Sequence, residues 1–234
     1  RSFHVTGVQT CALPILTVVF DPWVSAQFLG IVGGTLSGEA VQKGRSLFVD
    51  RLGEDVAAPI LTLVDDPTDP AAYTATETDG EGLATRRNVL LADGRLERFV
   101  HNSETARRAG TVSTGSAVRG YSSTPGVGIR AVAVVPGDRS PADLISGIRD
   151  GLLIQGVSGL HSGVNAVSGD FSTGAEGLRI RDGELAEPVR EFTIASTIQK
   201  MLNDVTAIGD DLQWLPMRAA GVTLVIGELT VSGV

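Results

Sequence analysis

Short apolar runs separated by turn signals dominate the pattern of hydrophobic and polar positions along this chain. Runs of this length are typical of single strands, because helices usually extend over about ten residues or more. We predict strands over Leu16–Phe20, Ile60–Val64, Ile129–Val135, Leu152–Val157 and Val222–Val231. Two Asp-Gly pairs, Asp93-Gly94 and Asp182-Gly183, lie between further apolar runs. Each pair predicts a β-hairpin, because Asp-Gly suits the tight turn between antiparallel strands.

Helical spacing of apolar residues is confined to a few segments. Asp21-Pro22 begins the first, since aspartate caps a helix and proline suits its first turn. We expect this helix to reach about Ala40, and a second helix to run from Ser140 to Asp150. The remaining helices are predicted over Ser103–Ala109 and Thr197–Ile208. Many short strands with about four helices predict a strand-rich α+β fold, built mainly from antiparallel sheets and hairpins.

The first fifteen residues do not fit this pattern. Val5–Ile15 reads VTGVQTCALPI, which back-translates to a common sequencing-library adapter. We therefore interpret residues 1–15 as an adapter remnant and exclude them from the fold. On this interpretation residues 16–234 are the native part, which begins within a longer protein. The only cysteine, Cys11, belongs to the remnant.

Composition narrows the range of functions. The formal net charge of −8 argues against nucleic acid as a partner, because phosphate binding needs a basic surface. The apolar runs are shorter than the roughly 18 residues of a membrane span, so we expect no membrane insertion. A native part without cysteine fits a reducing cytoplasm, which is where we expect the protein to act.

The acidic stretch between Leu61 and Gly94 is the first candidate for chemistry. Its carboxylates could bind a cation or act in hydrolysis, but their spacing is not that of an EF-hand loop. We favour turn formation, in which aspartate side chains cap nearby backbone groups. The two histidines of the native part, His101 and His161, lie in separate segments, and we expect hydrogen-bonding or surface roles for them. The carboxylates concerned are Asp65, Asp66, Asp69, Asp79 and Glu81.

Two glycine- and serine-rich stretches offer hydroxyl groups and backbone donors. Ser113, Thr114 and Gly115 lie in one stretch, and Ser168 and Asp170 lie in the other. These five residues are candidate peptide contacts, although ordinary turns explain the same composition. Phosphate-loop, dinucleotide-binding and GxSxG motifs do not occur in the sequence.

Several motifs in a fixed order resemble the C-terminal half of the TldD/PmbA family. They include SLFVDRLGEDV over residues 46–56, LTLVDDP over 61–67, DGEG over 79–82, LLADGRL over 90–96 and LTVSG over 229–233. The resemblance covers residues 16–234 and implies a C-terminal domain whose N-terminal domain is missing. It also implies a cytosolic protein that acts on peptides. TldD-type members of the family are zinc metallopeptidases, whereas PmbA/TldE-type members lack the zinc ligands and pair with a TldD-type partner.

The resemblance also implies a branch of the family. Where TldD-type chains carry HExxxH, this sequence has Asp21 and Ala26 in the histidine slots and Pro22 in the glutamate slot. The later CGKxGQ-like loop corresponds to residues 210–221, which contain no cysteine. The resemblance therefore implies a PmbA/TldE-type subunit with no catalytic or metal-binding residues of its own. Zinc is expected in a TldD-type partner, and a peptide is the expected substrate.

Two alternatives remain open at the level of the sequence. The chain could be an independent hydrolase that uses Asp65, Asp79, Glu81 or His161. It could also be a peptide-binding scaffold that acts alone.

Overall fold

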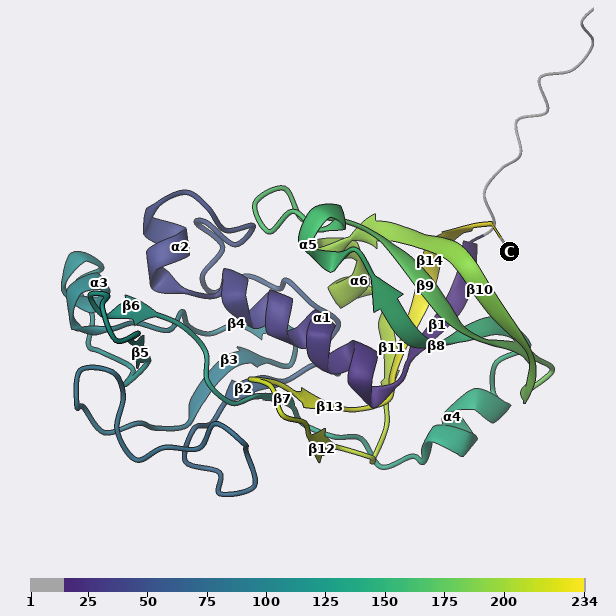
Figure 1. Cartoon of the computed structure of the whole chain (residues 1–234), viewed down its shortest axis with the longest axis horizontal. Helices are drawn as coiled ribbons and strands as arrows, with labels where there is room; N and C mark the ends of the chain where they lie inside the picture. Colours follow the sequence, from purple (N-terminus) through teal and green to yellow (C-terminus); the bar gives the residue numbers. More distant parts are fainter. Residues whose placement is uncertain (1–14, 234) are drawn as a thin grey trace, which may run out of the picture.

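Strand pairing arranges the chain into two main sheets that lie on either side of one central helix (Figure 1). This arrangement comes from a computed structural model that describes residues 15–233. Apart from Ile15, the predicted adapter remnant lies outside the described residues. The described residues include no helix that is long and apolar enough to cross a membrane.

The larger sheet closes on itself into a five-stranded barrel. Its strand order is β1-β8-β9-β10-β14, and β1 pairs with β14 to complete the ring. β1 and β8 are parallel, whereas the other neighbours are antiparallel, and β11 adds to the side of β14. The strands are β1 (Ile15–Phe20), β8 (Asp150–Ser158), β9 (Asp170–Arg181), β10 (Glu184–Thr197), β11 (Val205–Ile208) and β14 (Leu224–Ser232).

The second sheet has four short antiparallel strands in the order β4-β3-β2-β7. They are β2 (Leu63–Asp65), β3 (Asn88–Ala92), β4 (Arg95–Leu96) and β7 (Val132–Val134). Two further strand pairs are β5 (Ala117–Val118) with β6 (Gly126–Val127), and β12 (Gln213–Trp214) with β13 (Ala220–Gly221). These small strand pairs lie within the loops around the second sheet. Most residues in this part of the molecule belong to loops rather than to helices or strands.

Helix α1 (Pro22–Thr35) is the common core element. It packs against β1 and β8 of the barrel, and also against β7 and β13. Phe28 of α1 makes edge-to-face contacts with Phe20 and Phe171, with ring centroids 6.0 and 6.1 Å apart. A helix that is apolar on most sides is stable only when it is buried between other elements. The remaining helices are α2 (Gly38–Gln42), α3 (Ser103–Arg108), α4 (Pro141–Ser146), α5 (Leu160–Gly163) and α6 (Ile198–Asn203).

The strand-rich α+β prediction is confirmed, and both Asp-Gly pairs form hairpin turns. Asp93 and Asp182 adopt positive φ of 48° and 47°, as the first residue of such a turn requires. The prediction of about four helices was too low, because residues 15–233 contain six.

The helix boundaries were wrong at three places, each for a tertiary reason. The first helix ends at Thr35, because Ser37 forms a β-bridge with Val100. The helix from Ser140 ends at Ser146, since Asp150 already belongs to β8. The predicted helix over 197–208 ends at Asn203, and the residues after it pair with β14 as β11.

Candidate functional site

The start of α1 is the position at which the family resemblance expects a zinc motif. Asp21 caps the helix, and its Oδ1 accepts a hydrogen bond from the Val24 backbone N–H at 2.8 Å. Pro22 occupies the first turn, where its missing N–H costs nothing. Ala26 is buried. The helix cap predicted from the sequence is therefore present. It engages Asp21, which is the only carboxylate among Asp21, Pro22 and Ala26.

The segment before the final strand packs directly on this first turn. A Cβ at Gly221 would come within 1.9 Å of the Pro22 carbonyl oxygen, so that only glycine fits there. The Val222 N–H donates to the Ser25 hydroxyl at 3.0 Å, and this hydroxyl donates to the Pro22 carbonyl at 3.2 Å. The two segments in which the resemblance expects metal ligands are thus adjacent in space.

Electrostatics at the helix start centre on a pair of carboxylates. Burial raises the pKa of Asp21, and hydrogen bonds from the Val24 and Trp23 backbone oppose the rise. The negative charge of Asp211 raises the Asp21 pKa further. Asp211 itself accepts hydrogen bonds from the N–H and the hydroxyl of Thr223, at 2.9 and 2.8 Å. The carboxylates of Asp21 and Asp211 therefore both accept hydrogen bonds that hold the nearby backbone in place.

This donor set does not fit a zinc ion. Structural and catalytic zinc sites take three or four His, Cys or carboxylate ligands, whereas Pro22 and Ala26 offer no donor atom. Within residues 15–233, no group of three or more His, Cys, Asp or Glu side chains is arranged to hold a metal.

A groove of about 360 Å³ runs beside α1, next to Ala26. The small residues Gly30 and Gly34 of α1 line it on one side, and Met217 and Arg218 line it from the segment before β13. A surface that is poor in side chains allows another backbone to approach closely. The exposed Arg218 guanidinium adds a donor for a carboxylate or carbonyl group.

The acidic residues between Leu61 and Gly94 act mainly in turns and caps. Asp79 accepts from the backbone N–H groups of Glu81 and Leu83 through Oδ1, and from that of Ala117 through Oδ2. Glu81 accepts hydrogen bonds from the Ser103 N–H and hydroxyl at the start of α3. These contacts are the turn chemistry that the sequence favours. Asp65 is the exception in this stretch, because it is fully buried between strands.

The candidate peptide contacts lie in two separate regions. Ser113, Thr114 and Gly115 belong to the loop after α3. Ser168 lies in the exposed turn between α5 and β9, and its hydroxyl donates to Asp170, the first residue of β9. Gly115 has a φ of 71° and packs against the Ala84 carbonyl. The structure does not bring the two groups together, and peptide contact stays a prediction for each.

His101 has the hydrogen-bonding role expected from the sequence, but its partners were not predicted. The Thr114 hydroxyl accepts from the His101 N–H at 2.7 Å, and His101 Nδ1 lies 3.2 Å from the Thr105 hydroxyl oxygen. The spacing of Asn102 and Thr105 is a capping signal that could have placed Thr105 near the ring. The contact with Thr114 depends on tertiary structure and leaves no local signal.

Comparison with known proteins places this architecture in a defined class. A conserved-domain profile described as PmbA/TldA metallopeptidase C-terminal domain matches residues 15–233, which makes the chain a metallopeptidase-related domain. The chain belongs to the TldD/PmbA family. This assignment confirms the resemblance found in the sequence.

Individual relatives agree with the assignment. The chain is 30% identical over 198 residues to a metalloprotease of Methanothermobacter thermautotrophicus, covering 84% of this chain and 43% of the relative. It is 28% identical over 216 residues to the metalloprotease PmbA of Escherichia coli O157:H7, covering 92% and 45%. The crystal structure of TldE from Thermococcus kodakarensis superposes with a TM-score of 0.88 at 29% identity, over 94% of this chain and 51% of that chain.

These relatives are longer than the present chain, which spans about half the length of each. Relatives named as TldD homologs match over similar lengths and at similar identity. Overall identity therefore does not separate the TldD-type branch from the PmbA/TldE-type branch, and the separation depends on individual positions.

Proposed function

We propose that this chain is a zinc-free, PmbA/TldE-type subunit that works with a TldD-type zinc peptidase in proteolysis or peptide maturation. Zinc and the catalytic residues belong to the partner in this proposal, and the expected location is the cytoplasm. The chain itself contributes no catalytic group.

The observation that carries the proposal is the chemistry at the start of α1. The helix and the segment that packs on it are both in place, but Pro22 and Ala26 offer no ligand atoms. Asp21 is engaged as the helix cap. A subunit that keeps this scaffold without ligands is suited to a role in assembly or in holding a peptide.

The groove beside α1 supports the peptide-holding part of the proposal. Gly30 and Gly34 leave room for an extended backbone, and Arg218 lies at the side of the groove. An extended peptide presents carbonyl groups at regular intervals, and an arginine can pair with these groups or with a terminal carboxylate.

The direct test combines this chain with a TldD-type protein that carries HExxxH. We expect the two proteins to co-purify, and we expect peptide cleavage only from the mixture. The variant Gly30→Leu should reduce cleavage while co-purification persists, because a leucine side chain fills the groove. Ser162→Leu adds the same side chain on exposed helix α5 and should leave cleavage unchanged.

Two results would contradict the proposal. One is zinc bound by this chain alone at one ion per molecule. The other is peptide cleavage by this chain alone that is lost in Asp79→Ala or His161→Ala, which would favour the independent hydrolase. No observation favours that alternative at present, since Asp79 uses both carboxylate oxygens on backbone groups and His161 is exposed on α5.

A further inference from the structure

The groove beside α1 carries a single charge. Among the described residues that line it, Arg218 is the only charged one, and Gln27 is the only neutral residue with a polar side chain. The protein as a whole has a formal net charge of −8. A positive charge that stands alone in a groove of an acidic protein favours a ligand with an anionic group, because the groove walls concentrate its field.

The Arg218 side chain reaches from one lining segment of the groove to another. Its Nη1 atom lies 3.8 Å from the point at which a Cβ of Gly128 would be. The guanidinium groups of Arg130 and Arg139 donate to backbone carbonyls. That of Arg218 has no hydrogen-bond or ion-pair partner within residues 15–233. Its N–H donors are therefore available to a ligand in the groove.

Hydrogen bonds and close packing hold the lining segments in place. The Val132 N–H donates to the Arg218 carbonyl at 2.8 Å, which ties the two segments that face α1 to each other. Buried Asp65 accepts hydrogen bonds from the two backbone N–H groups before Val132. Helix α1 packs closely on the same segment, since a Cβ at Gly33 would come within 2.8 Å of Ile129. A site that is formed before binding loses little free energy in ordering its walls.

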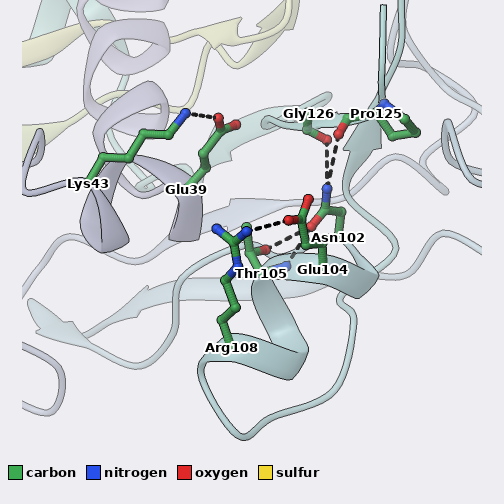
Figure 2. Close-up of polar contacts among 8 residues, drawn as sticks. All are labelled: Glu39, Lys43, Asn102, Glu104, Thr105, Arg108, Pro125 and Gly126. Carbon is green, nitrogen blue, oxygen red and sulfur yellow. Dashed lines mark hydrogen bonds and ion pairs between the residues drawn. The ribbon is translucent and has the colours of Figure 1, made fainter.

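The carboxylates beside β6 have partners of their own. Glu39 Oε2 lies 3.6 Å from the point at which a Cβ of Gly126 would be. Figure 2 shows that Lys43 pairs with Glu39, and that Arg108 pairs with Glu104 at 2.5 Å. Both carboxylates are thus balanced by neighbouring cations, and neither pairs with Arg218.

We propose that this groove holds the C-terminal end of an extended peptide, and that Arg218 pairs with its terminal carboxylate. The planar guanidinium matches the two oxygens of a carboxylate, and two parallel hydrogen bonds fix the direction of the peptide. Gly30, Gly34 and Gly128 leave room for the peptide backbone, to which a terminal carboxylate is directly attached. An amino terminus is disfavoured, because Arg218 repels its ammonium group. The pairing rests on the proposed function, since it names the substrate class for the same groove.

Binding of three peptides to the whole chain, without a partner, tests the proposal by isothermal titration calorimetry. The peptides are acetylated pentaalanine with a free carboxylate, the same peptide as its C-terminal amide, and that amide with a central aspartate. The free acid should bind about tenfold more tightly than either amide, the usual effect of one charge-assisted pair. Equal binding of the free acid and the plain amide, or no binding of any peptide, would overturn the proposal. An aspartate-containing amide that matches the free acid would overturn the assignment to the end of the peptide.

Variants at two arginines show which guanidinium is responsible. Arg218→Met keeps an unbranched side chain without the charge, so it should remove the preference for the free acid and leave binding of the plain amide unchanged. Arg218→Lys keeps the charge without the planar fork and should retain only part of the preference. Arg149→Met, at an exposed arginine between α4 and β8, should behave as the wild type. A full preference in Arg218→Met would contradict the role of Arg218.

The result can be told apart from that of the partner experiment. A TldD-type protein that neither co-purifies with this chain nor cleaves peptide in the mixture would contradict the proposed function. Equal binding of the free acid and the amide to the chain alone would contradict the pairing with Arg218 and leave the subunit role standing.

Discussion

Asp65 and Asn88 face each other as register partners across β2 and β3, and each has one buried oxygen that accepts no hydrogen bond from residues 15–233. The atoms are Asp65 Oδ2 and Asn88 Oδ1. The other carboxylate oxygen of Asp65 accepts from the backbone N–H groups of Arg130 and Ala131, at 2.9 and 2.7 Å. Two acceptors on paired residues lack a donor, and a proton on Asp65 would supply one.

An amide at position 65 should supply this donor permanently. Asp65→Asn keeps an oxygen for Arg130 and Ala131 and directs an N–H₂ group toward Asn88. We expect its free energy of unfolding at pH 7 to equal the wild-type value or to exceed it by about 1 kcal/mol. Asp65→Leu should lose about 2–4 kcal/mol, because it leaves two buried N–H groups unpaired. Urea denaturation measures both, and a clearly destabilised Asp65→Asn would refute the pairing.

The pH dependence of stability offers a separate check on Asp65. Burial raises its pKa in the folded protein above the ordinary 3.8, although the hydrogen bonds from Ala131 and Arg130 oppose the rise. The folded state therefore binds this proton more tightly than the unfolded state does. Its contribution to stability is present below pH 3.8 and is lost as the pH rises through the folded pKa. The stability advantage of Asp65→Asn should thus shrink from pH 7 to pH 4.

His101 should affect stability in a different pH range and with the opposite sign. Burial lowers its pKa below the ordinary 6.5, so the unfolded chain takes up a proton more readily. The wild type should lose stability as the pH falls below about 6.5, down to the folded pKa. His101→Phe should flatten this part of the profile. An unchanged slope in His101→Phe would rule out the effect.

Gly221 should tolerate no side chain, because the Pro22 carbonyl lies against its Cα. We expect Gly221→Ala to lower the melting temperature markedly, at a cost of about 2 kcal/mol or more from overpacking against backbone. Gly34→Ala is the matched control, since nothing lies within 4 Å of a Cβ there. It should gain up to about 1 kcal/mol from helix propensity. A neutral Gly221→Ala would mean that the segment before β14 is loosely held.

Glu191 is strained within the longest hairpin. Its φ is 59°, and it lies where the pairing between β9 and β10 shifts register. A left-handed conformation costs a residue with a side chain about 1 kcal/mol relative to glycine. Glu191→Gly should therefore stabilise the protein by roughly 0.5–1 kcal/mol in urea denaturation. Glu184→Gly, at an extended position of the same strand, should destabilise it.

Turn chemistry and strand periodicity made much of the fold predictable from the sequence. Asp93 and Asp182 mark the hairpins, and the apolar run at Leu16–Phe20 marks β1, because these signals act between neighbouring residues. The segment Val205–Ile208 was predicted as helix and forms a strand, since its partner β14 lies far along the chain. In such cases pairing with a neighbouring strand overrides the local helix propensity of the segment.

In the candidate site, too, some features follow from neighbouring residues and others depend on residues far apart in the sequence. The cap at Asp21 follows from adjacent residues, whereas its contact with the segment around Gly221 needs the folded barrel. The sequence offered Ser113 and Thr114 only as candidate peptide contacts, in a stretch that ordinary turns also explain. That Thr114 holds the His101 backbone could not be predicted, because thirteen residues separate the two.

Closure of the barrel by β1 and β14 joins the two ends of the described chain. Thr17 donates a hydrogen bond to the Gly227 carbonyl across 210 residues of sequence. During synthesis β1 is made before β14, and it has no β14 to pair with until that strand has left the ribosome. Contacts between distant residues slow folding, because a long loop must close before they form. Closure of the barrel therefore waits for β14, and until then the edge of β1 that pairs with β14 is open to pairing with other chains.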